Sequence, residues 1–205
     1  MRRLKERVLV VATHNLGKLE EIERLLVGFH FDLKSTKDLS LTSPKETESS
    51  FIGNAKIKAH YAATQTGFPS LADDSGLEVE CLQGAPGVLT ADWAATAKGR
   101  NFQFAMDRVW TEVNKTTHIK PYKARFVSAL VLAWPDGHAE IFEGSIKGTL
   151  VWPKRGKNGH GFDPMFQPDG YNQTFGEMDR WEKNAISHRG VAFNKLKTHC
   201  LEATI

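Results

Sequence analysis

The stretch Val8-Leu9-Val10-Val11-Ala12, followed by Thr13-His14-Asn15 and then by Leu16 to Val27, decides the fold class. The first five residues are apolar and rich in β-branched side chains, which predicts a strand buried on both faces. Polar residues then interrupt the run. Apolar residues recur at helical spacing at 19, 22, 25 and 26, so a helix is expected over 16–27. The chain therefore opens with a strand, a polar turn and a helix.

The rest of the chain first continues this alternation and then adds a hairpin. Further helices are expected over 51–66, 102–113 and 188–203, and further strands over 31–35, 77–82, 124–134 and 139–152. The last two strands are joined by Pro135-Asp136-Gly137, a turn sequence. This order predicts an α/β fold with a mixed sheet in a single domain over 1–205.

Composition narrows the possible partners. The chain has 205 residues, a net charge of +3 and interspersed charges, without the basic arm that would grip nucleic acid. A small charged molecule is therefore the expected partner. Residues 1–7 are too charged for a signal peptide, and no run approaches the roughly 20 apolar residues that span a bilayer. We expect a cytoplasmic protein in which Cys81 and Cys200 are reduced thiols, with a single disulfide as the alternative.

The turn Thr13-His14-Asn15-Leu16-Gly17-Lys18 has the features of a phosphate site. A helix N-terminus presents unpaired N–H groups and the positive end of a dipole. Asn15 can cap the helix, Gly17 allows close approach of the backbone, and Lys18 adds a cation. The Walker pattern is absent. Taken alone, the turn is more typical of a capped surface helix with a solvated lysine.

Two further segments gather polar and charged side chains, and the second of them is a candidate for metal chemistry. Asn54 and Lys58 share one helix face near Glu46, although a solvated helix start would look the same. In Leu71-Ala72-Asp73-Asp74-Ser75-Gly76, adjacent carboxylates follow the end of an apolar run. Like charges held together raise one pKa, and a hard cation such as Mg²⁺ relieves this. A hydrogen-bonded Asp-rich turn is the alternative.

Two later segments could contact a flat ligand or an anion. In Gly159-His160-Gly161-Phe162-Asp163-Pro164 two glycines flank the His160 ring, and His160 or Phe162 could stack on a purine. No cluster of Cys and His residues supports zinc there. Lys183-Asn184-Ala185-Ile186-Ser187-His188-Arg189-Gly190 gathers donors at a helix entrance, where Ser187 can serve as the cap. A glycine-rich turn and a charged cap are the plainer interpretations.

Taken together, these segments closely resemble the inosine triphosphate pyrophosphatase family, in particular the RdgB-like dITP/XTP pyrophosphatases. The resemblance runs from residue 8 to nearly the end, and its most specific blocks are Ala72-Asp73-Asp74-Ser75-Gly76-Leu77 and Ile186-Ser187-His188-Arg189-Gly190. It implies an elongated two-lobed fold around a long mixed sheet with helices on both sides and a substrate cleft between the lobes. It also implies a homodimer that hydrolyses deaminated purine nucleoside triphosphates to the monophosphate and pyrophosphate.

The resemblance also implies roles for individual residues. Glu46 and Asp74 would be Mg²⁺ ligands, and Asp74 would also accept the proton of the attacking water. The remaining implied contacts are with the substrate, through Thr13, His14, Asn15, Leu16, Gly17, Lys18, Asn54, Lys58, Ser75, His160, Gly161, Phe162, Asp163, Lys183, His188 and Arg189.

Three positions depart from the family pattern. His14 stands where a small residue is common, and His160 where phenylalanine is common. Ala91-Asp92 precedes Trp93 where the family often carries a basic residue. Three other functions fit the same sequence: hydrolysis of a different modified nucleotide, nucleotide binding without catalysis, and single-stranded RNA binding through aromatic side chains. The near-neutral charge disfavours the last of these.

Overall fold

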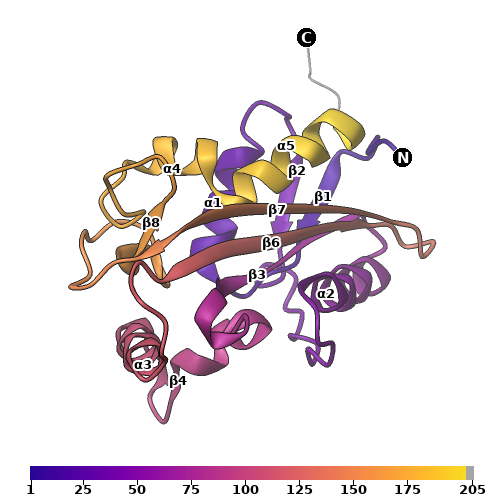
Figure 1. Ribbon diagram of the computed structural model, residues 1–205. Coiled ribbons are helices and arrows are strands. Elements are labelled where there is room, and N and C mark those ends of the chain that lie inside the picture. Colours follow the sequence, from indigo (N-terminus) through magenta and orange to yellow (C-terminus); the bar gives the residue numbers. More distant parts are fainter. Residues whose placement is uncertain (202–205) are drawn as a thin grey trace. The chain divides into compact units, whose positions relative to one another are not determined.

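The computed structural model describes residues 1–201 and confirms an α/β protein with a mixed sheet. Six strands are hydrogen-bonded in the order β2-β1-β3-β6-β7-β8, and β4 and β5 form a separate pair (Figure 1). The strands are β1 (Val8–Val11), β2 (Asp32–Ser35), β3 (Ser70–Val79), β4 (Ala95–Thr96), β5 (Gly99–Arg100), β6 (Lys123–Ala133), β7 (Ala139–Leu150) and β8 (Phe166–Pro168). The helices are α1 (Leu16–Leu25), α2 (Phe51–Thr66), α3 (Phe102–Asn114), α4 (Arg180–Ile186) and α5 (His188–Cys200).

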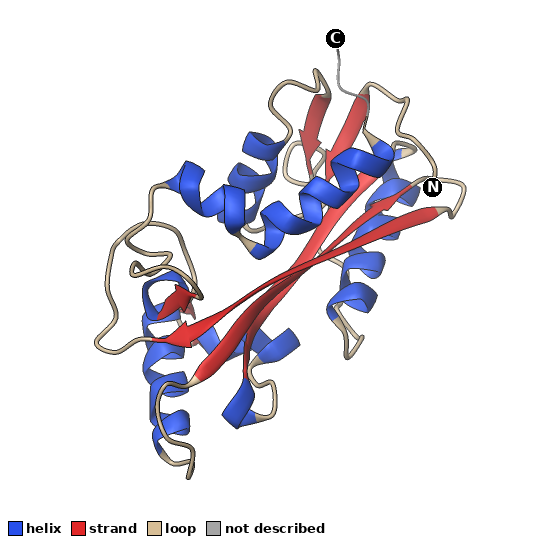
Figure 2. Ribbon diagram, turned by 45° about the horizontal axis from the view of Figure 1, so that its top comes forward, coloured by secondary structure: helices blue, strands red, loops and turns tan. Residues whose placement is uncertain are grey.

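The chain divides into two compact units, each with its own apolar core. Unit 1 comprises Met1–Asp74, Ser128–Gly144 and Arg189–Ile205, of which residues 202–205 are not described, and unit 2 comprises Ser75–Val127 and Ser145–His188. Strands β3, β6 and β7 contribute residues to both units, and β6 and β7 are the long strands that stand out in Figure 2. A single domain over 1–205 stays a prediction.

Unit 1 contains the parallel strands β2, β1 and β3, with helices on both faces. Strand β1 pairs in parallel with β2 and with β3, so Val11 lies opposite both Ser35 and Leu71. Helices α1 and α5 pack on one face, where Ile22 and Phe193 join the core, and α2 lies on the other side of the sheet from α5 (Figure 1). Buried alanines at 55, 59, 62 and 63 form the packed side of α2.

Unit 2 has a core rich in aromatic side chains. Phe126, Phe166 and Phe175 lie within 4.6–6.0 Å of one another, measured between ring centroids. Helix α3 packs on this core through buried residues such as Val109 and Val113. Strand β8 pairs antiparallel with β7.

Most elements predicted from the sequence are present, with two corrections. The expectation that Asp73 and Asp74 follow the end of a strand is wrong, because β3 runs through both of them and ends at Val79. Residues 80–82, expected to continue that strand, form a 3₁₀ turn. Helix α5 ends at Cys200, and the predicted extension at 202–203 lies outside the described residues. Both cysteines are free, as expected.

Candidate active site

The predicted phosphate turn begins α1 as expected. The Asn15 side chain accepts a hydrogen bond from Lys18 N at 3.2 Å, so it caps the helix. Thr13 Oγ1 accepts from Asn15 N, and Thr36 Oγ1 donates to the Thr13 carbonyl at 2.8 Å. These bonds fix the turn at a helix N-terminus, where backbone N–H groups favour an anion. Leu16 is 64% exposed, so the turn lies at the surface of unit 1.

His14, the unusual residue of this turn, contacts a neighbouring loop. Its Nε2 donates to the Leu41 carbonyl oxygen at 2.9 Å. Leu41 belongs to the segment that leads to Glu46. The histidine therefore ties the phosphate turn to the segment that carries a predicted metal ligand.

Asp73 is a buried structural carboxylate. It accepts hydrogen bonds from Ser128 Oγ at 2.6 Å and from Arg189 Nη2 at 3.0 Å, and Lys18 Nζ lies 2.9 Å from its Oδ2. Burial by itself would raise the pKa of this carboxyl group. The charges of Arg189 and Lys18 outweigh burial and hold the pKa of Asp73 well below its ordinary value.

Asp74 has very different surroundings, because successive strand residues point to opposite faces of a sheet. Its Oδ1 accepts from Lys58 Nζ of α2 at 2.8 Å. Its Oδ2 is buried and has no hydrogen-bond partner among the described residues. Burial raises the pKa of Asp74 above its ordinary value, and the charges of Lys58 and Lys18 oppose this only in part. A raised pKa makes a carboxylate a stronger proton acceptor.

Helix α2 also holds the segment that carries Glu46. Lys58 Nζ lies 3.3 Å from Glu46 Oε1, and the Asn54 side chain accepts from Glu48 N at 3.0 Å. Burial would lower the pKa of Lys58, but the carboxylates of Asp74 and Glu46 outweigh it and raise the pKa. Lys58 therefore remains a cation between these two carboxylates.

The carboxylates of Glu46 and Asp74 are a donor set that suits Mg²⁺ better than a metal ion held entirely by side chains. No group of three or more His, Cys, Asp or Glu side chains in residues 1–201 could hold a metal ion. Glu46 and Asp74 supply carboxylate oxygens, and the partnerless Asp74 Oδ2 is a buried atom that a cation would satisfy. Mg²⁺ commonly binds through one or two carboxylates together with waters and substrate phosphates.

The residues that hold Arg189 were not all predicted from the sequence. Its Nη1 pairs with Glu21 of α1 and its Nη2 with Asp73 of β3, and Arg189 is 2% exposed. This placement gives the guanidinium a structural role in unit 1, whereas its contact with a base stays a prediction. Glu21 and Ser128 carry no motif, so only the three-dimensional structure reveals them.

The remaining predicted substrate residues belong to unit 2. Lys183 Nζ lies 2.6 Å from Asp163 Oδ2, and the same oxygen accepts from His160 N at 2.8 Å. His188 stacks on Phe126, with ring centroids 4.8 Å apart. Phe162 is 1% exposed and meets Phe102 edge to face, so its ring belongs to the core. Ser75 is half-buried in β3. Their contacts with a substrate stay predictions.

Gly159 and Gly161 give a matched test of the Asp163 site. Both have positive φ angles, 73° and 69°, so alanine strains the backbone at either position. A Cβ at 159 would lie 2.0 Å from Asp163 Oδ2, whereas a Cβ at 161 would meet only Phe102, at 3.8 Å or more. A displaced Asp163 no longer pairs with the buried Lys183. We therefore expect Gly159→Ala to lower the free energy of unfolding, measured in urea, by about 2–4 kcal/mol more than Gly161→Ala does. Equal losses would contradict this role.

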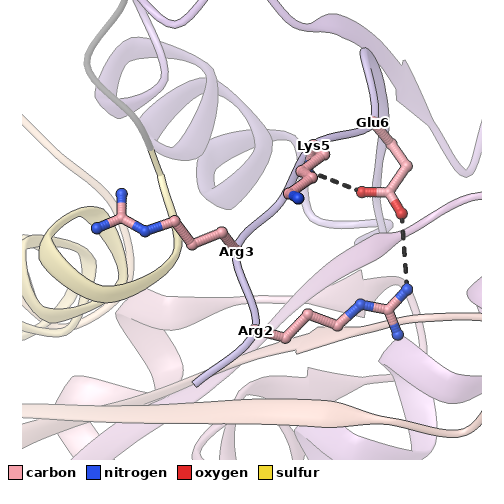
Figure 3. Close-up of a pocket in the computed structure, with 4 residues that line it drawn as sticks. All are labelled: Arg2, Arg3, Lys5 and Glu6. Atoms are coloured by element: carbon pink, nitrogen blue, oxygen red, sulfur yellow. Dashed lines mark hydrogen bonds and ion pairs between the residues drawn. The ribbon is translucent and has the colours of Figure 1, made fainter.

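Two surface pockets are lined by none of the predicted site residues. One is lined by Arg2, Arg3, Lys5 and Glu6. Figure 3 shows the Arg2 and Arg3 side chains pointing in opposite directions, and Arg2 pairs with Glu6 and with Asp136. The guanidinium groups of Arg2 and Arg3 therefore do not point at a common site in this pocket. The other pocket, at Thr96–Phe102 on the β4–β5 pair, contains no predicted site residue.

The fold and this site define a class: an α/β protein in which a capped phosphate turn, two lysines and a pair of adjacent carboxylates come together. The model of the Ham1 family matches residues 9–199. The chain therefore belongs to the Ham1 family.

Similar proteins support the same assignment. The chain is 54% identical to a dITP/XTP pyrophosphatase of Ruegeria pomeroyi over 94% of each chain. It is 50% identical to a dITP/XTP pyrophosphatase of Agrobacterium fabrum over 99% of this chain and 100% of that protein. Among solved structures, a HAM1 protein from Coxiella burnetii has a TM-score of 0.85 at 35% identity, covering 94% of this chain and 98% of that one.

Proposed function

We propose that this protein is a nucleoside triphosphate pyrophosphatase that hydrolyses dITP, ITP and XTP to the monophosphate and pyrophosphate. Such an activity keeps deaminated bases out of DNA and RNA. The observation that carries the proposal is the arrangement of Glu46, Lys58 and Asp74, in which one carboxylate keeps a buried oxygen without a partner. The similarity to proteins named dITP/XTP pyrophosphatase over nearly the whole chain supports the choice of substrate.

The proposed chemistry is attack of water on the α-phosphorus. Lys18 and Lys58 neutralise phosphate oxygens, since charge on a polyanion must be offset for attack. Asp74 accepts the proton as the water oxygen forms its bond to phosphorus. The bond from the α-phosphorus to the bridging oxygen breaks, and pyrophosphate leaves. Mg²⁺ held by Glu46 and Asp74 would supply further positive charge and lower the pKa of a bound water.

Selectivity follows from the edges of the bases. Hypoxanthine and xanthine carry a 6-oxo acceptor where adenine carries an amino donor. An ammonium N–H of Lys183 that is not used by Asp163 would donate to the oxo group but would face another donor in adenine. Leaving a buried donor unpaired is a strong means of rejection. Guanine shares the 6-oxo group and must be rejected at its 2-amino side.

No helix in the described part of the chain is long and apolar enough to cross a membrane. The magnesium requirement, a homodimer and a cytoplasmic location complete the proposal, and the family resemblance supports them.

Pyrophosphate release from dITP, XTP, dGTP and ATP, measured with Mg²⁺ and with EDTA, tests this function. We expect metal-dependent release from dITP and XTP and at least about 100-fold less from ATP, because a mispaired buried donor discriminates strongly. Equal turnover of all four would discard the selectivity mechanism. Turnover of none would favour a binding protein, and a preference for another modified nucleotide would redirect the substrate assignment.

A further inference from the structure

Lys58 lies where it neutralises both proposed metal ligands at once. Its Nζ is 2.8 Å from Asp74 Oδ1 and 3.3 Å from Glu46 Oε1, and its side chain is 11% exposed. The Glu46 side chain is 40% exposed and that of Asp74 is 9% exposed. One ammonium group thus lies close to both carboxylates and offsets the charge of each.

A divalent cation that took the same two carboxylates would come close to this ammonium. A divalent cation and an ammonium group that contact the same carboxylates repel each other strongly. Partial burial strengthens this repulsion, because it weakens the screening by water. Asp74 Oδ2 offers the cation an additional oxygen. The ammonium nevertheless reduces the negative charge that the two carboxylates present to the cation.

A triphosphate provides an alternative partner for the lysine. The lysine side chain is a flexible four-carbon stem, so its ammonium can leave the carboxylates for a phosphate oxygen without movement of α2. Phosphate oxygens would then compensate the ammonium, and both carboxylates would be available to the metal. Binding of nucleotide would strengthen binding of metal, and linkage requires the converse.

We propose that Lys58 is a resident counter-cation that competes with Mg²⁺ for Glu46 and Asp74 and moves to the triphosphate when the nucleotide binds, so that metal and nucleotide bind cooperatively. This inference rests on the proposed function. It gives Lys58 a second role beyond contact with phosphate: it disfavours binding of the metal alone.

The chain contains a matched control in Lys18. Its Nζ lies 2.9 Å from Asp73 Oδ2, a pairing chemically similar to that of Lys58 with Asp74. Asp73, however, also accepts from Ser128 and from Arg189. Removing Lys18 therefore leaves Asp73 held by other donors, whereas removing Lys58 frees a carboxylate.

The test is isothermal titration of Mg²⁺ into the full chain and its Lys58→Met, Lys58→Gln and Lys18→Met variants. Each is titrated with and without a dITP analogue that carries a non-hydrolysable α,β-methylene bridge. We expect the analogue to raise the Mg²⁺ affinity of the unchanged protein by about tenfold or more. Both Lys58 variants should bind Mg²⁺ alone about tenfold more tightly than the unchanged protein and lose most of the cooperativity. Lys18→Met should show a smaller gain, because Lys18 acts on Asp74 only by its charge and pairs directly with Asp73.

Unchanged or weaker Mg²⁺ binding in folded Lys58 variants would overturn the inference, as would equal Mg²⁺ affinity of the unchanged protein with and without the analogue. The second criterion needs no variant, so it holds even if the Lys58 variants fail to fold. Failure of the proposed function looks different, because none of the proteins would then release pyrophosphate from dITP, whether or not they bind the analogue.

Discussion

Replacement of Asp74 by asparagine is expected to slow pyrophosphate release from dITP by about 10²- to 10⁴-fold, the range that a positioned general base contributes. Asparagine keeps the size of the side chain but accepts no proton and binds Mg²⁺ less well. Steady-state release of pyrophosphate measures the effect. Asp32→Asn is the matched control, since Asp32 is 50% exposed and its carboxylate contacts only Lys34 among the described residues. It should leave turnover unchanged.

The same Asp74→Asn substitution is not expected to weaken the fold. Burial raises the pKa of Asp74 although Lys58 opposes it, so folding disfavours the charged form of this group. Above that raised pKa, the negative charge therefore lowers the free energy of unfolding. We expect the unfolding temperature of Asp74→Asn to equal or exceed that of the unchanged protein. Normal turnover in this variant would contradict the catalytic role, and a collapsed unfolding temperature would contradict the electrostatic account.

Replacement of Arg189 by methionine is expected to lower the free energy of unfolding by about 3–5 kcal/mol near neutral pH, the usual result of removing one partner from a buried ion pair. The substitution leaves Glu21 and Asp73 buried without the guanidinium that joins them. Urea unfolding measures the loss. Arg7→Met, at an exposed position before β1, should change stability by no more than about 0.5 kcal/mol.

The pH dependence of this loss has a defined sign. In the unchanged protein the pKa of Asp73 lies well below its ordinary value, despite burial, because of Arg189 and Lys18. Its stabilisation is therefore present above the ordinary pKa and is lost as pH falls through the folded pKa. Without Arg189 that pKa rises, and protonation removes the uncompensated charge. The difference between variant and unchanged protein should shrink from about pH 7 to about pH 4. A constant difference would contradict the buried pair as its cause.

Local sequence patterns predicted most of the fold, because they depend on neighbouring residues. The apolar run of β1, the Asn15 cap and the alanine-rich face of α2 are visible in short windows. The sequence predicts that this strand begins at 77, whereas β3 begins at Ser70, because Asp73 and Asp74 are typical of a polar turn. The partners that allow these charges inside a strand lie 16, 55 and 116 residues away in the chain. A local sequence pattern cannot show that partners so far away in the chain offset the charges of Asp73 and Asp74.

The candidate site shows the same limit. The residue types in each segment indicated phosphate and metal chemistry, and the family resemblance assigned roles to them. Neither distinguished the two adjacent carboxylates by their partners. That distinction depends on which helix covers which face of unit 1, because α1 and α5 supply the cationic partners of Asp73 and α2 supplies that of Asp74.

The placement of Asp73 and Asp74 on opposite faces of β3 has an evolutionary consequence. A change at Asp73 must be accompanied by changes at Glu21 and Arg189, since all three share one buried network. A change of Asp74 to asparagine keeps an oxygen that can accept from Lys58, and Glu46 still pairs with that lysine. A single-nucleotide mutation converts an aspartate codon to asparagine. On the proposed mechanism, a descendant that folds but does not turn over substrate is therefore one mutational step from this chain.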